Sequence, residues 1–145
     1  MKIVPYLNFD GKCAEAFRFY QQVLGGKLEV LTHSNTPIAG EVPPGWGDRV
    51  LHACLRVGDQ TIMASDTPPE QHARPQGLYV SLHVDRPEEA ERIFGQLAEQ
   101  GEVTMPLGPT FWALRFGVCV DRFGTPWMIN CGVPAEQLEA SMAGR

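Results

Sequence analysis

Apolar and polar positions in the first half of the chain predict a strand, a helix and three further strands. Short β-rich runs alternate with one segment in which apolar side chains recur at helical spacing, as Ala14, Phe17 and Phe19-Tyr20 do. The helix and strands are separated by glycine, proline and other breakers. The five elements are predicted at 3–9, 11–24, 27–32, 50–57 and 61–65.

The boundaries of these elements carry their own signals. Pro5 suits an edge strand or a strand end better than a central position. Asp10 is a candidate N-cap for the helix, and Gly25-Gly26 is a candidate stop. Gly58-Asp59 is a tight-turn signature that joins the last two strands. The breaker-rich segment 33–48 is expected to be a loop, and its Trp46 is a lid candidate.

The second half predicts the same order of elements. Pro87 stands where the first turn of a helix tolerates proline, and Gly101 is expected to end that helix. A short amphipathic helix is expected at 134–143, with Leu138 and Met142 on its apolar side. The four strands are predicted at 78–84, 103–107, 114–120 and 127–131.

The two halves therefore read as a repeat. The run Leu7 to Asp10 returns as Leu82 to Asp85, an offset of 75 residues (83 minus 8), about half of the 145. A unit too small to bury its own apolar face packs against its copy, and pockets form at such seams. We expect an α+β fold of two βαβββ modules, 1–66 and 77–132, joined by a linker at 67–76 in a single domain, 1–145.

Composition excludes several classes of protein. The net charge of −5 and the absence of a basic stripe argue against binding to nucleic acid or to an anionic membrane surface. Neither a secretory signal nor an apolar run of about 18 residues is present. The cysteines lack a CxxC pair and are expected to be reduced and mostly buried, which predicts a cytoplasmic protein. They are Cys13, Cys54, Cys119 and Cys131.

Several longer motifs carry a resemblance to a known family. The chain resembles the glyoxalase and bleomycin-resistance fold, the vicinal oxygen chelate superfamily, and more closely its PhnB-like branch. This resemblance implies paired, curved, mixed sheets around a cleft with helices outside, and a homodimer. It covers nearly the whole chain and is carried by the segments 5–11 (PYLNFDG), 61–66 (TIMASD), 110–117 (TFWALRFG) and 121–130 (DRFGTPWMIN).

The resemblance also gives a test for a metal. Enzymes of this superfamily hold a divalent metal with side chains from the first and fourth strands of each module, typically His or Gln and Glu. Alignment places Pro5, Met63, Tyr79 and Met128 at these positions, and none is a good ligand for such an ion. We therefore expect no metal and no other cofactor. The alternative is a relocated divalent site that uses His83 with Asp66 or Asn130.

Side chains at every second position of a strand share one face, and this alternation predicts which residues lie together. The face that it selects is apolar and polarisable with a few hydrogen-bonding groups, the composition of a ligand pocket. An aromatic pair followed by a guanidinium could clamp a planar or anionic ligand. The alternative is that these side chains fill the core, with the arginine packed on a tryptophan or paired with Asp121. Leu7 is expected on the same face. The candidate pocket residues are Met63, Ser65, Tyr79, Ser81, His83, Phe111, Trp112, Arg115, Met128 and Asn130.

Two functions follow as hypotheses, with the catalytic residues unknown. The first is a metal-free module that binds a small organic ligand in a cleft between the modules, like the bleomycin-resistance proteins. The second is a lyase or oxygenase with a divergent metal site or metal-independent chemistry. Cys13, in the first turn of a helix, is a weak nucleophile candidate, and Ser65-Asp66 with His83 lacks the context of a triad. No glycine-rich phosphate loop is present.

Overall fold

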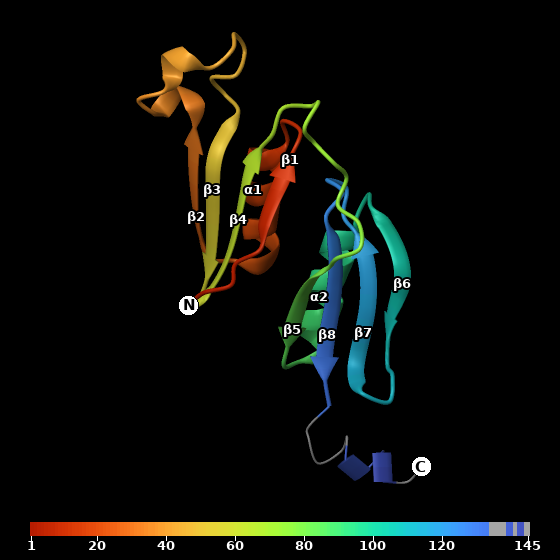
Figure 1. The fold of residues 1–145 in the computed structure, drawn as a ribbon. Coiled ribbons are helices and arrows are strands. Elements are labelled where there is room, and N and C mark those ends of the chain that lie inside the picture. Colours follow the sequence, from red (N-terminus) through yellow and green to blue (C-terminus); the bar gives the residue numbers. More distant parts are fainter. Residues whose placement is uncertain (134–138, 141, 144–145) are drawn as a thin grey trace. The chain divides into compact units, whose positions relative to one another are not determined.

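The structure, a computed structural model, describes residues 1–133, 139–140 and 142–143. The chain divides into two compact units, Met1–Ala73 and Arg74–Arg145, here called the N-terminal and C-terminal units (Figure 1). Their boundary falls within the predicted linker, 67–76. The shared core expected of a single domain stays a prediction, and most of the helix expected at 134–143 lies outside the described residues.

The N-terminal unit has one helix and a four-stranded mixed sheet of order β1-β4-β3-β2. The pair β1 and β4 is parallel, and the other two pairs are antiparallel. Two short 3-10 helices, His33–Asn35 and Ala39–Glu41, lie in the breaker-rich loop. The main elements are β1 (Tyr6–Phe9), α1 (Cys13–Leu24), β2 (Lys27–Thr32), β3 (Val50–Val57) and β4 (Gln60–Asp66).

The C-terminal unit repeats this arrangement. Its sheet has the order β5-β8-β7-β6, again with one parallel pair, β5 and β8. The elements are β5 (Val80–Val84), α2 (Pro87–Ala98), β6 (Glu102–Gly108), β7 (Ala113–Val120) and β8 (Pro126–Gly132). The predicted α+β class and the two βαβββ modules are therefore confirmed. Within the described residues, no helix has the length and apolar character that crossing a membrane requires.

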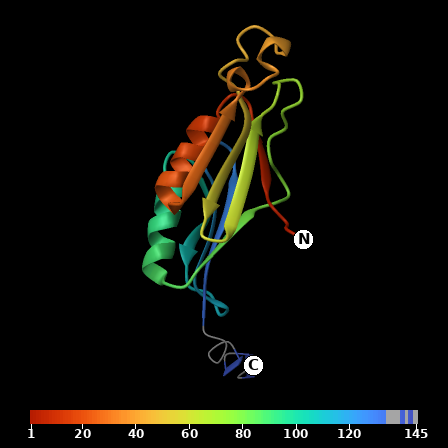
Figure 2. The ribbon, with the colours of Figure 1, turned by 90° about the vertical axis from the view of Figure 1, so that its left-hand side faces the viewer.

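Each helix covers one face of its own sheet. Figure 2 shows α1 lying along the sheet of β1 to β4. The inner side of α1 is aromatic, with Phe17 and Tyr20 fully buried, and Phe17 meets Phe9 of β1 edge to face. Burial of such a side chain contributes about 1.5–3 kcal/mol. In α2, Ile93, Phe94 and Leu97 are buried in the same way.

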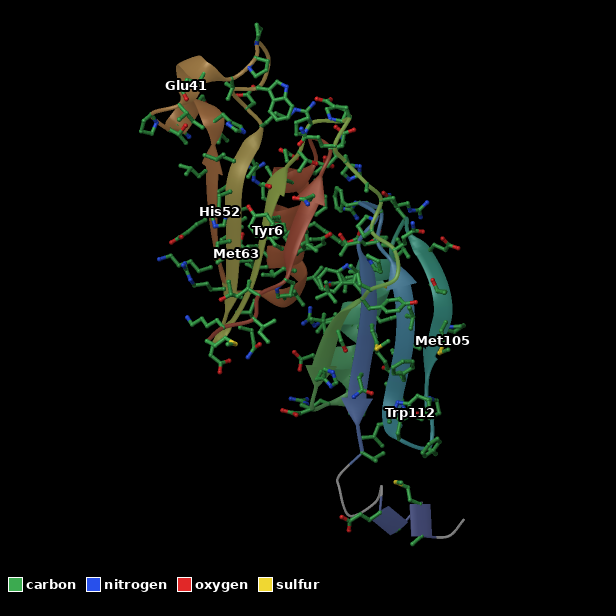
Figure 3. All side chains as sticks on the ribbon, viewed as in Figure 1. Tyr6, Glu41, His52, Met63, Met105 and Trp112 are labelled. Carbon is green, nitrogen blue, oxygen red and sulfur yellow. The ribbon has the colours of Figure 1, made fainter. Side chains whose placement is uncertain are left out.

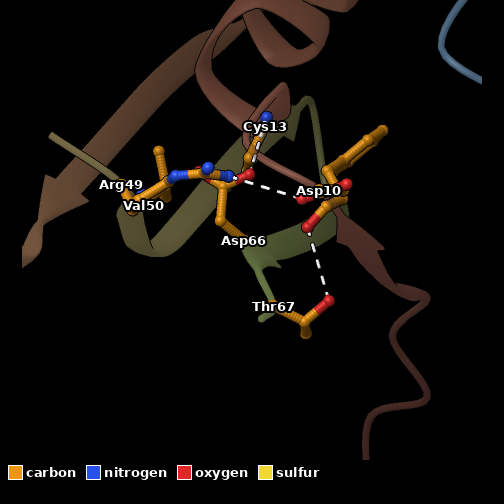
Figure 4. A network of polar contacts seen from close by, with 7 residues as sticks. Asp10, Cys13, Arg49, Val50, Asp66 and Thr67 are labelled. Atoms are coloured by element: carbon orange, nitrogen blue, oxygen red, sulfur yellow. Dashed lines mark hydrogen bonds and ion pairs between the residues drawn. The ribbon is translucent and has the colours of Figure 1, made fainter. Parts of the chain in front are cut away.

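The N-terminus of α1 differs from the prediction. The N-cap residue is Lys12 rather than Asp10, and no side chain of the cap itself bonds to the helix. Instead, Asp66 at the end of β4 accepts a hydrogen bond from the Cys13 backbone N–H at 3.1 Å (Figure 4). Its other carboxylate oxygen accepts the backbone N–H of Val50 at 2.9 Å. A residue 53 positions away in sequence thus satisfies one free donor of the helix.

The remaining helix boundaries largely follow their sequence signals. Gly25, at φ 76°, ends α1 as predicted, and Pro87 occupies the first turn of α2 as predicted. The second helix ends at Ala98, three residues before the predicted stop at Gly101. Gln100 then takes a positive φ of 60°, which reverses the chain before glycine is reached.

A buried carboxylate also organises the hairpin between β7 and β8. One oxygen of Asp121 accepts the backbone N–H groups of Phe123 and Thr125, at 2.8 and 3.0 Å. The other accepts the indole N–H of Trp127 at 2.8 Å. Asp121 and Trp127 are both buried, so these bonds replace the water that the carboxylate loses on folding. Asp59, in the two-residue turn of the first hairpin, is exposed and bonds its neighbour Gln60.

We predict that Asp121→Asn lowers the free energy of unfolding by about 1.5–3 kcal/mol. The substitution replaces one of the two accepting oxygens with an amide nitrogen, which cannot accept a hydrogen bond from the N–H group that faces it. Urea unfolding followed by tryptophan fluorescence measures this change. The control is Asp59→Asn, the same substitution at an exposed aspartate in the turn of the other hairpin, for which we expect a change within about 0.5 kcal/mol. Equal effects of the two substitutions would contradict this account of the hairpin.

Candidate functional site

In each unit, one face of the sheet is not covered by the unit's own helix, and we call it the open face. Side chains on a strand alternate between faces, so burial separates the two sets. On β4, Ile62, Ala64 and Asp66 are buried while the residues between them are partly exposed. The open face of the N-terminal unit carries Tyr6 and Asn8, Thr61, Met63 and Ser65, His52, Cys54 and Arg56, and Lys27, Glu29 and Leu31.

Polar pairs lie on this N-terminal open face. The Tyr6 hydroxyl lies 3.2 Å from Nδ1 of His52, and the two rings are stacked with centroids 5.9 Å apart. In Figure 3 both residues lie near Met63 on the face turned away from α1. Arg56 and Glu29 form an ion pair at 3.2 Å. This face therefore combines an aromatic pair, a thioether and paired charges.

The open face of the C-terminal unit is arranged in two rows across the strands. Residues directly opposite one another on paired strands share a face. One row runs from His83 through Asn130 to Phe116. The second runs through Ser81, Met128, Val118 and Met105. The first row begins with hydrogen-bonding groups, and both rows end in apolar ones.

The polar end of this face is a hydrogen-bonded cluster. Nε2 of His83 lies 3.1 Å from the Ser81 hydroxyl, and Nδ1 lies 3.3 Å from the Asn130 amide nitrogen. Ser81 and His83 are exposed, and Asn130 is half-buried. The structure thus brings together three of the predicted pocket residues.

The apolar end is aromatic. Trp112 meets Phe116 edge to face, with centroids 5.4 Å apart, and Phe111 meets Trp112 at 5.0 Å. Figure 3 labels Trp112 and Met105 in this region. Their side chains, with 41% and 47% of their surface exposed, are available to a ligand. The predicted aromatic pair therefore continues the same face through Phe116.

The strand register corrects the positions aligned with the superfamily's metal ligands. Pro5 and Tyr79 both precede their strands, and Tyr79 is exposed. The residue opposite Met63 on β1 is Tyr6, and the residue opposite Met128 on β5 is Ser81. Leu7 was predicted on the face of Met63, which is wrong: it lies opposite Ala64 and is buried on the helix side.

This donor set does not fit a hard or borderline divalent ion. Two thioethers, a phenol and a serine hydroxyl are poor substitutes for imidazole and carboxylate. Among residues 1–133, 139–140 and 142–143, no cluster of three or more His, Cys, Asp or Glu side chains is arranged to hold a metal. The carboxylate of Asp66, suggested above as a partner for His83, is buried and bonds two backbone N–H groups on the helix side.

Arg115 does not lie with the other predicted pocket residues. It stands opposite the buried Cys131, which places it on the helix side of the sheet. Its Nε donates to Glu91 of α2 at 3.0 Å, and Nη1 donates to the backbone carbonyl of Leu114. The predicted clamp of aromatic rings and this guanidinium is therefore wrong, and so is the alternative pairing with Asp121. A bulge after Ala113 shifts the alternation of side chains by one residue, so Arg115 points to the opposite face from the one predicted.

Trp46, the lid candidate, packs within its own loop. Its ring meets His33 edge to face at 5.9 Å, and the Arg49 guanidinium lies over it at 5.3 Å. Arg49 also pairs with Asp10 at 3.6 Å, as Figure 4 shows. These contacts favour the alternative in which Trp46 is structural.

The thiols of Cys13 and Cys119 are not activated. Burial, and then the negative charge of Asp66, raise the pKa of Cys13 well above its ordinary value. Burial and the charge of Asp121 raise the pKa of Cys119 to about 11. Because the thiolate is the nucleophile, a raised pKa lowers reactivity at neutral pH, which contradicts a nucleophilic role for Cys13.

Sequence reasoning missed four residues of the open faces. Tyr6 was missed because the predicted register of β1 was wrong by one position. His52 was missed because β3 was not considered as a source of polar side chains. Phe116 and Met105 were missed because bulges in β7 and β6 interrupt the regular alternation of side chains between the two faces. The spacing of His52, Cys54 and Arg56 at every second position along β3 was a usable sequence signal for His52.

Comparisons with known proteins agree with this architecture. A model of the Glyoxalase/Bleomycin resistance protein/Dioxygenase superfamily matches residues 2–129. Protein YjdN from Escherichia coli is 36% identical over 139 residues, covering 90% of this chain and 95% of YjdN.

Two solved structures extend the comparison. Protein PA1353 from Pseudomonas aeruginosa is 50% identical with a TM-score of 0.84, covering 91% of this chain and 98% of that one. The PhnB protein from Bacillus cereus is 27% identical with a TM-score of 0.75, covering 91% of this chain and all of that one. From the family model, the repeated βαβββ modules and these relatives, the chain belongs to the glyoxalase/bleomycin resistance/dioxygenase superfamily and has PhnB as a structural neighbour.

Proposed function

We propose that this protein is a PhnB-like, metal-free binding module that holds a small organic ligand against the open faces of its sheets. The observation that carries the proposal is the composition of the C-terminal open face. The polar cluster there adjoins the partly exposed side chains of Met128, Phe116 and Trp112. Small-molecule sites have this composition, an apolar lining with a few placed polar groups.

The N-terminal open face supports the same function. Tyr6 has 48% of its surface exposed and presents an aromatic ring fixed by His52, next to Met63. A thioether adapts its shape to different ligands, and an aromatic ring gives a large contact area with little loss of conformational entropy. Both properties suit a binding surface for organic molecules.

The proposal of a metal-free site is supported by the donors at the register positions of the superfamily's ligands. Tyr6, Met63, Ser81 and Met128 supply no imidazole and no carboxylate. The alternative is a lyase or oxygenase with a divergent divalent site through His83, the exposed imidazole of the C-terminal open face.

Ligand binding is tested with a panel of neutral mono- and bicyclic aromatic compounds, with naphthalene as the reference, by equilibrium dialysis. We expect Trp112→Leu and Phe116→Leu to weaken binding about tenfold, since each loses aromatic contact area and an edge-to-face partner. The control is Phe123→Leu, in the hairpin at the other end of β7, which we expect to leave binding unchanged. Absence of binding across the panel would overturn the proposal.

Metal content is tested by elemental analysis of protein purified without chelator. We expect no divalent metal at a stoichiometric level, and no loss of ligand affinity after dialysis against a chelator. A stoichiometric divalent metal that disappears in His83→Gln would overturn the metal-free proposal and establish the alternative.

We also propose a homodimer. The open faces leave large apolar side chains exposed on the edge strands, including Leu31 of β2 and Met105 of β6. Exposed apolar side chains of this kind are typical of protein interfaces. The four buried, unpaired cysteines support a reducing compartment such as the cytoplasm.

Light scattering coupled to size exclusion tests the oligomeric state. We expect a mass of about twice 16.0 kDa. Leu31→Glu combined with Met105→Glu is expected to shift the equilibrium toward monomer, because burial of an unpaired charge is costly. The control, Ile3→Glu, changes an equally apolar exposed side chain outside the strands. A monomeric mass for the unmodified chain would refute the homodimer.

A further inference from the structure

The polar cluster of the C-terminal open face engages both nitrogens of one imidazole. Ser81 and His83 stand two residues apart on β5, so their side chains share a face, and Asn130 lies directly opposite His83 on β8. The contacts, 3.1 Å to Ser81 and 3.3 Å to Asn130, fix the plane of the ring. The exposed serine hydroxyl is one terminus of this short hydrogen-bonded chain.

Each partner of His83 can reverse its hydrogen bond. When the Asn130 amide nitrogen donates to Nδ1, the proton of the neutral ring is on Nε2, which donates to the Ser81 oxygen. The serine O–H is then free to donate outward. When the amide is rotated so that its oxygen accepts from Nδ1–H, Nε2 accepts from the serine, whose oxygen lone pairs then face outward. The cluster can thus give or accept one hydrogen bond at Ser81.

A hydroxyl group matches this property, because it also donates and accepts. The three side chains of the cluster carry no formal charge when the imidazole is neutral, so a strongly charged group on a ligand gains no ion pair from them. The complementary polar group is therefore a neutral hydroxyl.

The surroundings of the cluster specify what bears that hydroxyl. Met128 adjoins Ser81, and Phe116 adjoins Asn130, with Trp112 edge to face against Phe116. Neighbouring strands lie about 4.8 Å apart, so the side chains of β5 and β7 that flank β8 are about 10 Å apart. Aromatic rings and thioethers make favourable contacts with a flat ring. Methionine and phenylalanine thus offer a surface for one planar ring beside the polar group.

We propose that the C-terminal open face binds aromatic alcohols of the phenol class, with the hydroxyl on Ser81 and the ring against Met128 and Phe116. This inference rests on the proposed function and names the chemical class of its ligand. Ser81 is the contact residue for the hydroxyl. His83 is a positioning residue that Asn130 orients.

The test compares 2-naphthol with 2-methoxynaphthalene, its methyl ether, by equilibrium dialysis at about pH 8, where an ordinary imidazole is neutral and the phenol is not ionised. The ether keeps the ring but cannot donate a hydrogen bond. We expect the phenol to bind at least about tenfold more tightly, since a site with paired polar groups discriminates against a ligand that leaves them unpaired. Ser81→Ala and His83→Gln are each expected to remove most of this preference while leaving the affinity for the ether nearly unchanged.

The matched control is His72→Gln, which changes a histidine between β4 and β5, outside both open faces, and is expected to retain the preference for the phenol. Thermal unfolding of each variant checks that it is folded. Equal affinity for phenol and ether would overturn the role of the cluster while leaving the apolar binding face in place. Loss of the preference in His72→Gln but not in His83→Gln would overturn its location. Binding of neither compound would overturn the phenol class, and the naphthalene panel would then decide the proposed function separately.

Discussion

A single helix can cover only one face of a four-stranded sheet, and this constraint determines what each module of the protein presents. The buried rings of α1 and the apolar side of α2 remove one sheet face from water in each unit. The other face is left with side chains whose polarity is not dictated by the core of the unit. Since the strands are fixed by helix packing and by their ladders, the open faces can vary in chemistry without loss of the fold.

The two open faces illustrate this freedom. The first carries an ion pair, Arg56 with Glu29, and a tyrosine bonded to a histidine. The second has a hydrogen-bonded cluster of serine, histidine and asparagine beside aromatic and thioether groups. The backbone has been duplicated, whereas the side chains at matching places differ. A ligand that fits one face is therefore not expected to fit the other equally well, because ion pairs and neutral hydroxyl sites select different groups.

The fold could be predicted from the sequence because its signals are local. These signals act within a few residues, and all were placed correctly. They are the alternating apolar positions, Gly25 at a helix end, Pro87 at a helix start and the Gly58-Asp59 turn.

The site was predicted in part. Ser81, His83, Met128 and Asn130 share an open face, since strand parity holds along β5 and β8. Leu7 and Arg115 were misplaced where a boundary or a bulge changes parity by one residue, which moves a side chain to the other face.

The carboxylate of Asp66 joins segments that are distant in sequence. It closes the N-terminus of α1 at Cys13 and holds the first residue of β3, although it is itself the last residue of β4. During synthesis on the ribosome, α1 emerges more than fifty residues before the group that satisfies its first N–H. The helix of the N-terminal unit is therefore completed only when its last strand is available, so this module gains its stability as one cooperative unit rather than element by element.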